Sequence, residues 1–145
     1  MKVLTIKEPF ATLIKNKVKY IETRSWKTNY RGELYIQAGV AKIRKEVKER
    51  KGLSELYNED ELNYGHIICK CNLVDCIYMT EEFIKKEKEK NKNNFIAGHY
   101  EVGRYAWVLE NVEPITPIKV KGQLGIWNYK SYKKCYNTSN ILIKI

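Results

Sequence analysis

Short β-prone segments recur along the whole chain, separated by turn residues and short helical segments. A chain of 145 residues with no internal repeat is expected to form a single domain. Strands interrupted by only two to three helices predict an α+β fold, a small mixed β-barrel, rather than a repeated βαβ unit. The expected strands are residues 3–6, 20–24, 33–37, 65–78, 105–109, 118–120 and 126–129, of which 65–78 is the longest.

The first helix is expected directly after the first strand. Proline suits the first turn of a helix, and Pro9 follows Glu8 at that position. Beyond it, apolar residues at helical spacing form one face, namely Phe10, Leu13 and Ile14. Residues 42–50 predict a second, basic helix.

Two later stretches are expected to be irregular. Thr80 and the two glutamates after it predict a helix start. Residues 85–94 consist entirely of Lys, Glu and Asn, and so polar a segment predicts a loop or a frayed helix. Pro114 and Pro117 are expected to bracket a turn.

The chain is strongly basic, with a formal net charge of +10. The excess is concentrated in residues 42–51, 85–92 and 130–145. Such an excess of positive charge favours polyanionic partners such as RNA. Solvated faces of a lysine-rich protein explain the same excess equally well. The last segment, residues 131–145, is interpreted as a basic C-terminal extension of a domain formed by residues 1–130.

The composition also limits the class of protein. We find no apolar run of membrane-spanning length and no apolar core of a secretory signal near the N-terminus, so a cytoplasmic protein without a membrane partner is expected. Its thiols would then be reduced. The cysteines, which are Cys69, Cys71, Cys76 and Cys135, form no C-x-x-C pair. Buried apolar thiols are therefore expected rather than a metal site, and no cofactor is predicted.

Three blocks of sequence follow one another along the chain. They are EPFA, KYIETRSW and YRGELYIQA within residues 8–38; GHIICKCNLVDC from residue 65; and YAWVLENV with KGQLGIW within residues 105–127. Together they cover most of residues 3–129, and in this order they resemble the ASCH family of PUA-like barrels. The resemblance implies a PUA-like mixed β-barrel with two to three flanking helices. It also implies a cleft between the first helix and the K-x-x-E-x-R segment, with RNA, a nucleotide or a modified nucleoside as the partner.

The K-x-x-E-x-R segment supplies Lys19, Glu22 and Arg24. On a strand, Glu22 and Arg24 share a face, and Lys19 joins them if it lies in the preceding turn. Neighbouring positive charge eases the deprotonation of a lysine, whereas a nearby carboxylate holds the proton. A reactive amine, a simple ion pair, and a structural network that closes the barrel therefore all stay open.

Further ligand contacts are expected around this cluster. Aromatic rings stack on bases, and arginine binds phosphate or a base edge. The ligand-binding candidates are Glu8, Phe10, Arg24, Trp26, Tyr30 and Arg31. The family usually has glutamine at the position of Glu8, and an acid there would repel phosphate or carry a proton. His99 is interpreted as a residue of the cleft border or of the free surface, whereas Trp107 and Trp127 are expected in the core.

Two functions are consistent with the cluster. The first is binding of RNA or a nucleotide without chemistry. The second follows from ASCH relatives that are amidohydrolases for acylated cytidine, with a lysine, a threonine and a glutamate as catalytic groups. Lys19 matches the lysine, the threonine position falls on Glu22 beside Thr23, and Glu81 or Glu87 would supply the glutamate. Ribonuclease activity is a variant of this second function.

In the hydrolytic alternative, each member of the cluster has a role. Lys19 activates water or attacks the amide, and Glu22 shuttles the proton. Arg24, or a backbone amide, stabilises the oxyanion.

Overall fold

A computed structural model describes residues 1–130, 132–134 and 142–144, which contain a mixed sheet of six strands. The strands are β1 (Lys2–Ile6), β2 (Ile21–Arg24), β3 (Gly32–Ala38), β4 (His66–Tyr78), β5 (Tyr105–Lys119) and β6 (Ile126–Asn128). Their order across the sheet is β2-β5-β4-β3-β1-β6. A separate pair, β7 (Tyr132–Lys134) with β8 (Leu142–Lys144), is antiparallel. Cys135 and most of the predicted basic extension lie outside the described residues.

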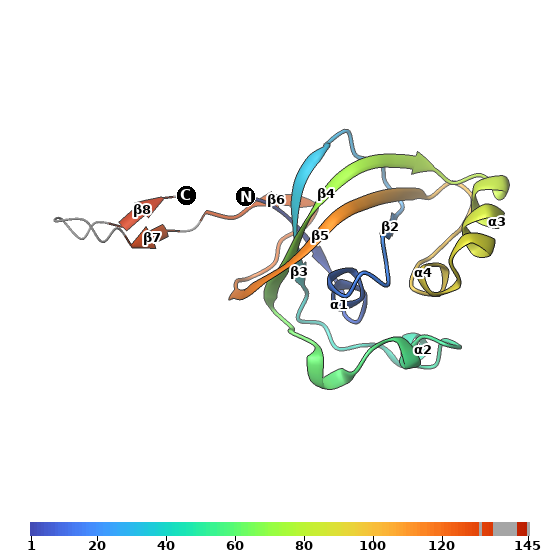
Figure 1. Ribbon diagram of the computed structural model, residues 1–145, viewed down its shortest axis with the longest axis horizontal. Coiled ribbons are helices and arrows are strands. Elements are labelled where there is room, and N and C mark those ends of the chain that lie inside the picture. Colours follow the sequence, from blue (N-terminus) through green and yellow to red (C-terminus); the bar gives the residue numbers. More distant parts are fainter. Residues whose placement is uncertain (131, 135–141, 145) are drawn as a thin grey trace.

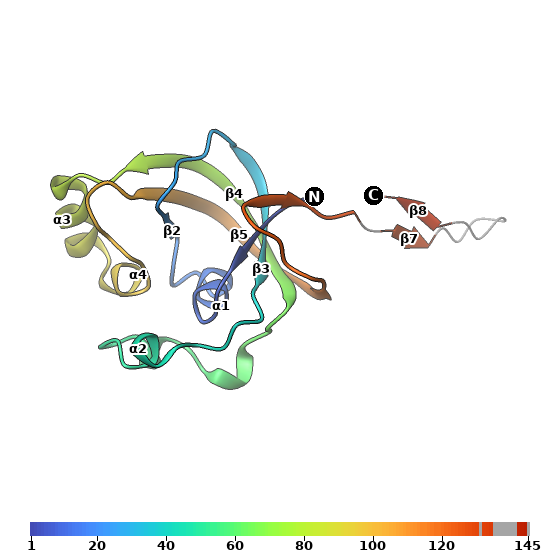
Figure 2. The same cartoon turned by 180° about the vertical axis from the view of Figure 1, so that it is seen from behind.

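The sheet is mixed because β1 runs parallel to β3 and antiparallel to β6. The other neighbouring strands are antiparallel. The strands curl around the first helix, α1 (Phe10–Lys15), and the remaining helices lie at the end of the molecule away from β6 (Figures 1 and 2). This curled α+β half-barrel confirms the predicted fold class.

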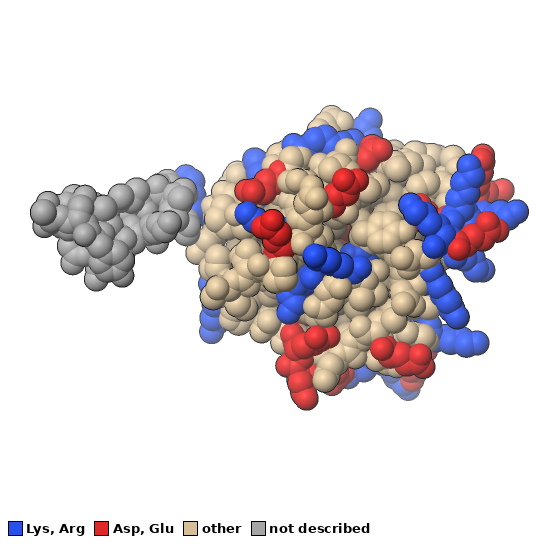
Figure 3. All heavy atoms as spheres, in the orientation of Figure 1, with Lys and Arg blue, Asp and Glu red and all other residues tan. Residues whose placement is uncertain are grey.

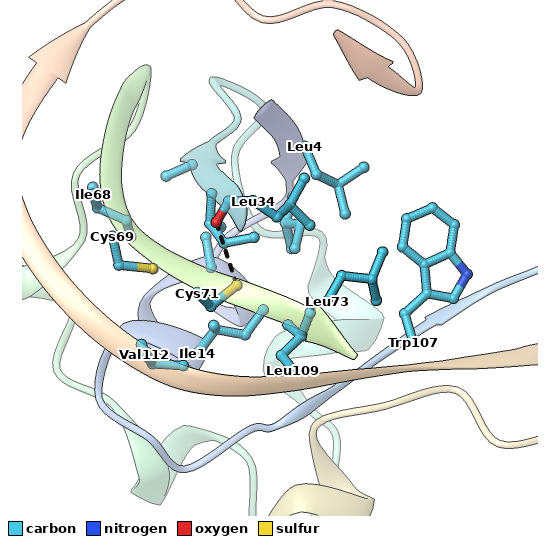
Figure 4. Packing of buried hydrophobic residues seen from close by; sticks show 14 residues of the cluster. Leu4, Ile14, Leu34, Ile68, Cys69, Cys71, Leu73, Trp107, Leu109 and Val112 are labelled. Carbon is cyan, nitrogen blue, oxygen red and sulfur yellow. Dashed lines mark hydrogen bonds between the residues drawn. The ribbon is translucent and has the colours of Figure 1, made fainter. Parts of the chain in front are cut away.

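The core lies between α1 and the concave face of the sheet. Ile14 of α1 packs in one cluster with Leu34, Leu73 and Trp107, all of them at most 1% exposed (Figure 4). Burying a side chain of this size contributes about 1.5–3 kcal/mol, so the cluster holds α1 firmly against the strands. Trp127 is also buried, in a second cluster with Val3 and Ile67, which confirms the core role predicted for both tryptophans.

Cys69 and Cys71 are free and buried in the same core. The Sγ of Cys71 donates to the carbonyl oxygen of Leu34 at 3.4 Å. Burial raises the pKa of the Cys71 thiol to about 12, so the thiol stays neutral and unreactive at physiological pH. These two cysteines act as small apolar residues, as predicted.

Of the two alternatives predicted for residues 85–94, a loop or a frayed helix, the loop is wrong, and the segment is helical. The segment forms α3 (Glu81–Lys90) and α4 (Lys92–Ile96). Thr80 caps α3 by accepting from Phe83 N at 3.1 Å, and Asn91 caps α4 by accepting from Asn94 N at 3.0 Å. Glu87 and Asn94 are buried, so the segment packs through polar side chains that have partners elsewhere in the chain.

The turn predicted at Pro114 and Pro117 is also wrong, because both prolines lie within β5, which is longer than β4. Strand β2 pairs only with residues 105–108 of β5, so the part of β5 that contains the two prolines has no neighbouring β2 strand on that side. The register with β4 also shifts between Ile67 and Cys69, opposite Pro114. Proline is tolerated at such edges and bulges because few ladder hydrogen bonds are lost there.

The helix predicted for residues 42–50 is reduced to one turn, α2 (Lys45–Lys48), and two 3₁₀ turns follow it, η1 (Ser54–Leu56) and η2 (Glu59–Glu61).

Among the described residues, no helix combines the length and apolar character needed to cross a bilayer. Over the same residues, no three His, Cys, Asp or Glu side chains are grouped so that they could hold a metal ion.

Candidate functional site

A cavity of about 510 Å³ opens beside the curled sheet. Its wall comes from the end of β1 with the start of α1, from residues 19–26, from Arg50, from the segment after α4, and from residues 123–125. This volume falls within the range of small-molecule and cofactor sites. Because its lining residues come from both ends and the middle of the sequence, the cavity brings distant parts of the chain together in one site.

Lys19 reaches the cavity from the turn between α1 and β2. The Lys17 backbone has a φ of 64°, and the amides of Val18 and Lys19 both donate to the Leu13 carbonyl oxygen at 3.0 Å. The strand then begins at Ile21, so Lys19 lies before it, as one of the sequence alternatives required. The residue is 1% exposed, and its Nζ donates to the Ala97 carbonyl oxygen at 2.7 Å.

Glu22 lies next to the Lys19 amine. Its Oε1 is 3.5 Å from Nζ of Lys19. Burial lowers the pKa of Lys19 below the ordinary 10.5; Glu22 opposes this shift, and the positive charges of Arg24 and Arg50 add to it. The amine is therefore easier to deprotonate than an ordinary lysine while it still has a carboxylate partner.

Arg24 completes the cluster from the same face of β2. Its Nε and Nη2 each lie 2.9 Å from Oε2 of Glu22, and Nη2 also donates to the Thr5 carbonyl oxygen at 3.0 Å. Two cations thus share one carboxylate. Because the Glu22 charge is compensated within the cluster, the cluster retains net positive charge when Lys19 is protonated.

The charged residues of the lining are mostly basic. Its basic residues are Lys7, Lys19, Arg24, Arg50 and Arg104, and Glu22 is the one acidic residue among the lining residues. Arg50 donates to the carbonyl oxygens of Ile96 at 2.9 Å and Gly98 at 3.3 Å. Its guanidinium lies 5.5 Å from the centre of the Phe10 ring. Such a wall favours an anionic ligand.

Thr23 and Arg104 fix the rim near His99. The Thr23 hydroxyl accepts from His99 N at 3.0 Å, and Arg104 donates to the carbonyl oxygens of Thr23 at 3.2 Å and His99 at 3.1 Å. The exposed His99 ring forms a 3.3 Å ion pair with Glu101 when protonated. The Thr23 hydroxyl therefore has a structural partner at the rim of the cavity.

Trp26 presents an aromatic surface to the cavity and is 39% exposed. Its ring meets Trp107 edge to face, with centroids 4.6 Å apart and planes at 87°. The indole N–H of Trp107 donates to the Trp26 carbonyl oxygen at 3.2 Å. The exposed ring is therefore held in place by a buried one, which suits it to stacking on a planar ligand.

Comparison with known families covers the residues of this cavity. The family model of the ASCH domain matches residues 4–138, which include all the cavity-lining residues. The chain belongs to the ASCH domain family. No curated protein matches it in a direct comparison.

Six of the residues predicted for the site line the cavity of this ASCH domain. They are Phe10, Lys19, Glu22, Thr23, Arg24 and Trp26. His99 was predicted to lie either at the cleft border or on the free surface, and it also lines the cavity. The structure thus brings together most of the K-x-x-E-x-R region in one place.

Glu8 does not line the cavity. It is 2% exposed and folds back on α1, where its carboxylate accepts from Thr12 N at 2.9 Å and from the Thr12 hydroxyl at 2.6 Å. It also accepts from Asn63 N at 3.2 Å. The acid that replaces the family's usual glutamine therefore anchors the start of the helix and a distant loop.

Tyr30 and Arg31 also lie outside the cavity lining. The Tyr30 hydroxyl donates to the Glu33 carbonyl oxygen at 2.6 Å, and Arg31 donates to that of Thr28 at 3.0 Å. Both shape the loop before β3. Of the two glutamates considered for catalysis, Glu81 is exposed, Glu87 lies 3.4 Å from the Tyr20 hydroxyl, and neither lines the cavity.

Sequence reasoning missed Arg50, Arg104 and Lys7 as lining residues. Arg50 was counted within a basic helix, and Arg104 within a turn. Both make their contacts with backbone carbonyl oxygens, which leave no pattern in side-chain spacing. For Lys7, its place directly after the first strand and before EPFA was the available signal.

Proposed function

We propose that this ASCH domain binds RNA by holding one nucleotide unit in the cavity. The observation that carries the proposal is the pairing of a basic lining with the exposed face of Trp26. Nucleotides combine a planar base with a phosphate, and single-stranded RNA is recognised by stacking on aromatic rings and by contacts from arginine and lysine. The basic side chains would take the phosphate, and Trp26 would take the base.

Trp26 offers a direct test of this proposal. The chain has three tryptophans, and Trp107 and Trp127 are buried, so a base stacked in the cavity should quench mainly the Trp26 emission. We would titrate the protein with uridine monophosphate and short oligouridylates while following tryptophan fluorescence. Saturable quenching that disappears in Trp26→Phe supports the proposal.

The matched control for this titration is Trp127→Phe, because Trp127 is buried in the core and is not itself a lining residue, although its indole N–H donates to the lining residue Thr5. This variant should retain the quenching seen with the wild-type chain. Binding that persists without any change in Trp26 emission would contradict placement of the base beside this ring.

A second candidate function rests on the Lys19 amine. It is buried beside Glu22 in a cavity of nucleoside size, and burial lowers its pKa. A neutral amine there could take a proton from water as that water attacks the acyl carbon of an N4-acylcytidine. Glu22 would pass the proton to the departing amine, and Arg24 would stabilise the oxyanion.

This second candidate is tested with N4-acetylcytidine. We would follow its conversion to cytidine by chromatography for the wild type, Lys19→Ala and Lys45→Ala. Lys45 is an exposed lysine outside the cavity, so its variant should match the wild type. Turnover lost only in Lys19→Ala supports hydrolysis. No turnover at high protein concentration counts against this substrate and leaves RNA binding as the leading hypothesis.

A further inference from the structure

A second hollow adjoins the cavity, and we name it the lysine groove. It has a volume of about 370 Å³ and lies between the segment after α2 and the helices α3 and α4. Its charged lining residues are Arg50, Lys51, Lys88 and Lys92, and its apolar lining residues are Phe95 and Ile96. Arg50 and Gly98 line both hollows, so the cavity and the groove lie side by side and share one wall.

The charge of the lysine groove is not compensated locally. Among the acids of residues 1–130, none lies within 4.0 Å of the amines of Lys51, Lys88 or Lys92, and all three residues are exposed. Two nearby lysines outside the groove do have such partners: Lys86 lies 3.0 Å from Glu82, and Lys48 lies 3.8 Å from Glu59. The groove next to the cavity is therefore lined by three lysines whose charge has no acid partner among these residues.

The apolar residues of the groove are fixed in place. The Phe95 ring stacks on Tyr100 with centroids 4.6 Å apart and planes at 14°. The backbone carbonyl oxygen of Ile96 accepts from Arg50 at 2.9 Å. An ordered apolar floor with a basic rim is the combination that single-stranded nucleic acid uses, since bases and sugars pack on the floor and phosphates meet the rim.

We propose that the lysine groove binds the phosphates adjoining the nucleotide in the cavity, so that the ligand is a single-stranded RNA segment rather than a free nucleotide. This inference rests on the proposed function, because the cavity is where the strand is anchored. Figure 3 shows Lys and Arg side chains gathered, with acids interspersed, at the end of the molecule formed by the helices. The groove places part of that positive charge next to the cavity.

The test compares ligand lengths and removes the groove lysines. We would measure the affinity of the full chain for uridine monophosphate and for hexauridylate, together with the dependence of each affinity on salt. In Lys88→Gln/Lys92→Gln, hexauridylate affinity should fall about tenfold, several times more than that of the mononucleotide. The slope of log affinity against log salt should become shallower by about 0.7 for each lysine removed.

The matched control is Lys85→Gln/Lys86→Gln, which removes the same charge from α3 outside the groove. An equal loss in this control would overturn the groove assignment, as would equal affinities of the wild type for the two ligand lengths. Equally tight binding of hexaglutamate would overturn the assignment to RNA. Absence of Trp26 quenching by any nucleotide would instead overturn the proposed function, so the two failures are distinguishable.

Discussion

The amine of Lys19 and the carboxylate of Glu22 lie 3.5 Å apart with side chains only 1% and 9% exposed. Arg24 binds the same carboxylate from its other oxygen. A buried pair of this kind contributes little compared with apolar packing, yet removal of one partner leaves an uncompensated charge. The cluster is therefore sensitive to changes in charge at any of its three members.

We expect Glu22→Gln to lower the free energy of unfolding by about 3 kcal/mol at neutral pH, because Lys19 and Arg24 would lose their shared counter-charge. Urea denaturation measures this change. The control is Glu59→Gln, since Glu59 pairs with Lys48 at the exposed surface and should cost less than about 1 kcal/mol. Equal losses in the two variants would contradict a buried charge cluster.

The lowered pKa of Lys19 predicts a pH dependence of stability. Between that lowered value and the ordinary 10.5, the unfolded chain holds a proton that the folded chain does not. The contribution of Lys19 to the free energy of unfolding therefore rises with pH in this window. Urea denaturation gives the free energy of unfolding of the wild type and of Lys19→Met. As pH rises towards about 10, where tyrosines begin to titrate, the difference between the two should shift in favour of the wild type.

A constant difference between wild type and Lys19→Met across that window would contradict the lowered pKa. The upper limit on pH is needed because burial raises the pKa of Tyr100. The folded chain then holds the tyrosine proton longer than the unfolded chain does. Above the ordinary pKa of tyrosine this effect lowers stability as pH rises, opposite in sign to that of Lys19.

Asn94→Ala should destabilise the fold by about 2–4 kcal/mol, because buried backbone donors lose their acceptor. The Asn94 side-chain oxygen accepts from Tyr20 N at 2.9 Å and Ile21 N at 3.2 Å, and its amide donates to the Tyr100 hydroxyl at 3.0 Å. Thermal denaturation measures the loss. Asn93→Ala, an exposed change in the same helix, should leave the melting temperature nearly unchanged.

Trp26→Ala should weaken nucleotide binding about tenfold, consistent with the roughly 1–3 kcal/mol assigned to one stacked base. A filter-binding measurement with labelled oligouridylate gives the affinity without relying on fluorescence. Tyr78→Ala removes an aromatic ring that is 51% exposed and lies outside the cavity lining. If this control weakens binding as much, stacking on Trp26 is not the cause.

Gly98→Ala should lower stability by about 1–3 kcal/mol through overpacking. A Cβ added at Gly98 would lie 2.5 Å from Cε2 of Tyr100, so the ring that stacks on Phe95 would have to move. Urea denaturation measures the cost. At Gly39 an added Cβ meets its nearest atom at an ordinary 3.5 Å, and an unchanged Gly39→Ala would show that the effect is specific to position 98.

The segments that the sequence predicted correctly are those whose own pattern determines their structure. The strand from Glu33 to Gln37 and the helix after Pro9 have alternating or helical apolar spacing, and both occur as expected. The K-x-x-E-x-R segment likewise predicted three lining residues, because its spacing places two side chains on one face of a short strand.

The errors occur where distant partners determine the structure. Residues 85–94 are polar, but Asn94 is buried by hydrogen bonds to Tyr20 and Tyr100, and no local pattern encodes those contacts. Pro114 lies in a strand because β2 does not extend beside it. Arg50 enters the cavity wall through carbonyl oxygens of a helix that the sequence had not predicted.

The pairing of β1 with β6 has a consequence for synthesis of the chain. Thr5 lines the cavity, and its hydroxyl accepts a hydrogen bond from the Trp127 indole, 122 residues later. On the ribosome, one edge of β1 therefore stays unpaired until almost the whole domain has been translated. An unpaired strand edge readily joins other strands, so this edge of β1 is protected only after β6 has emerged, and the cavity wall is complete only once residues 123–125 have been made.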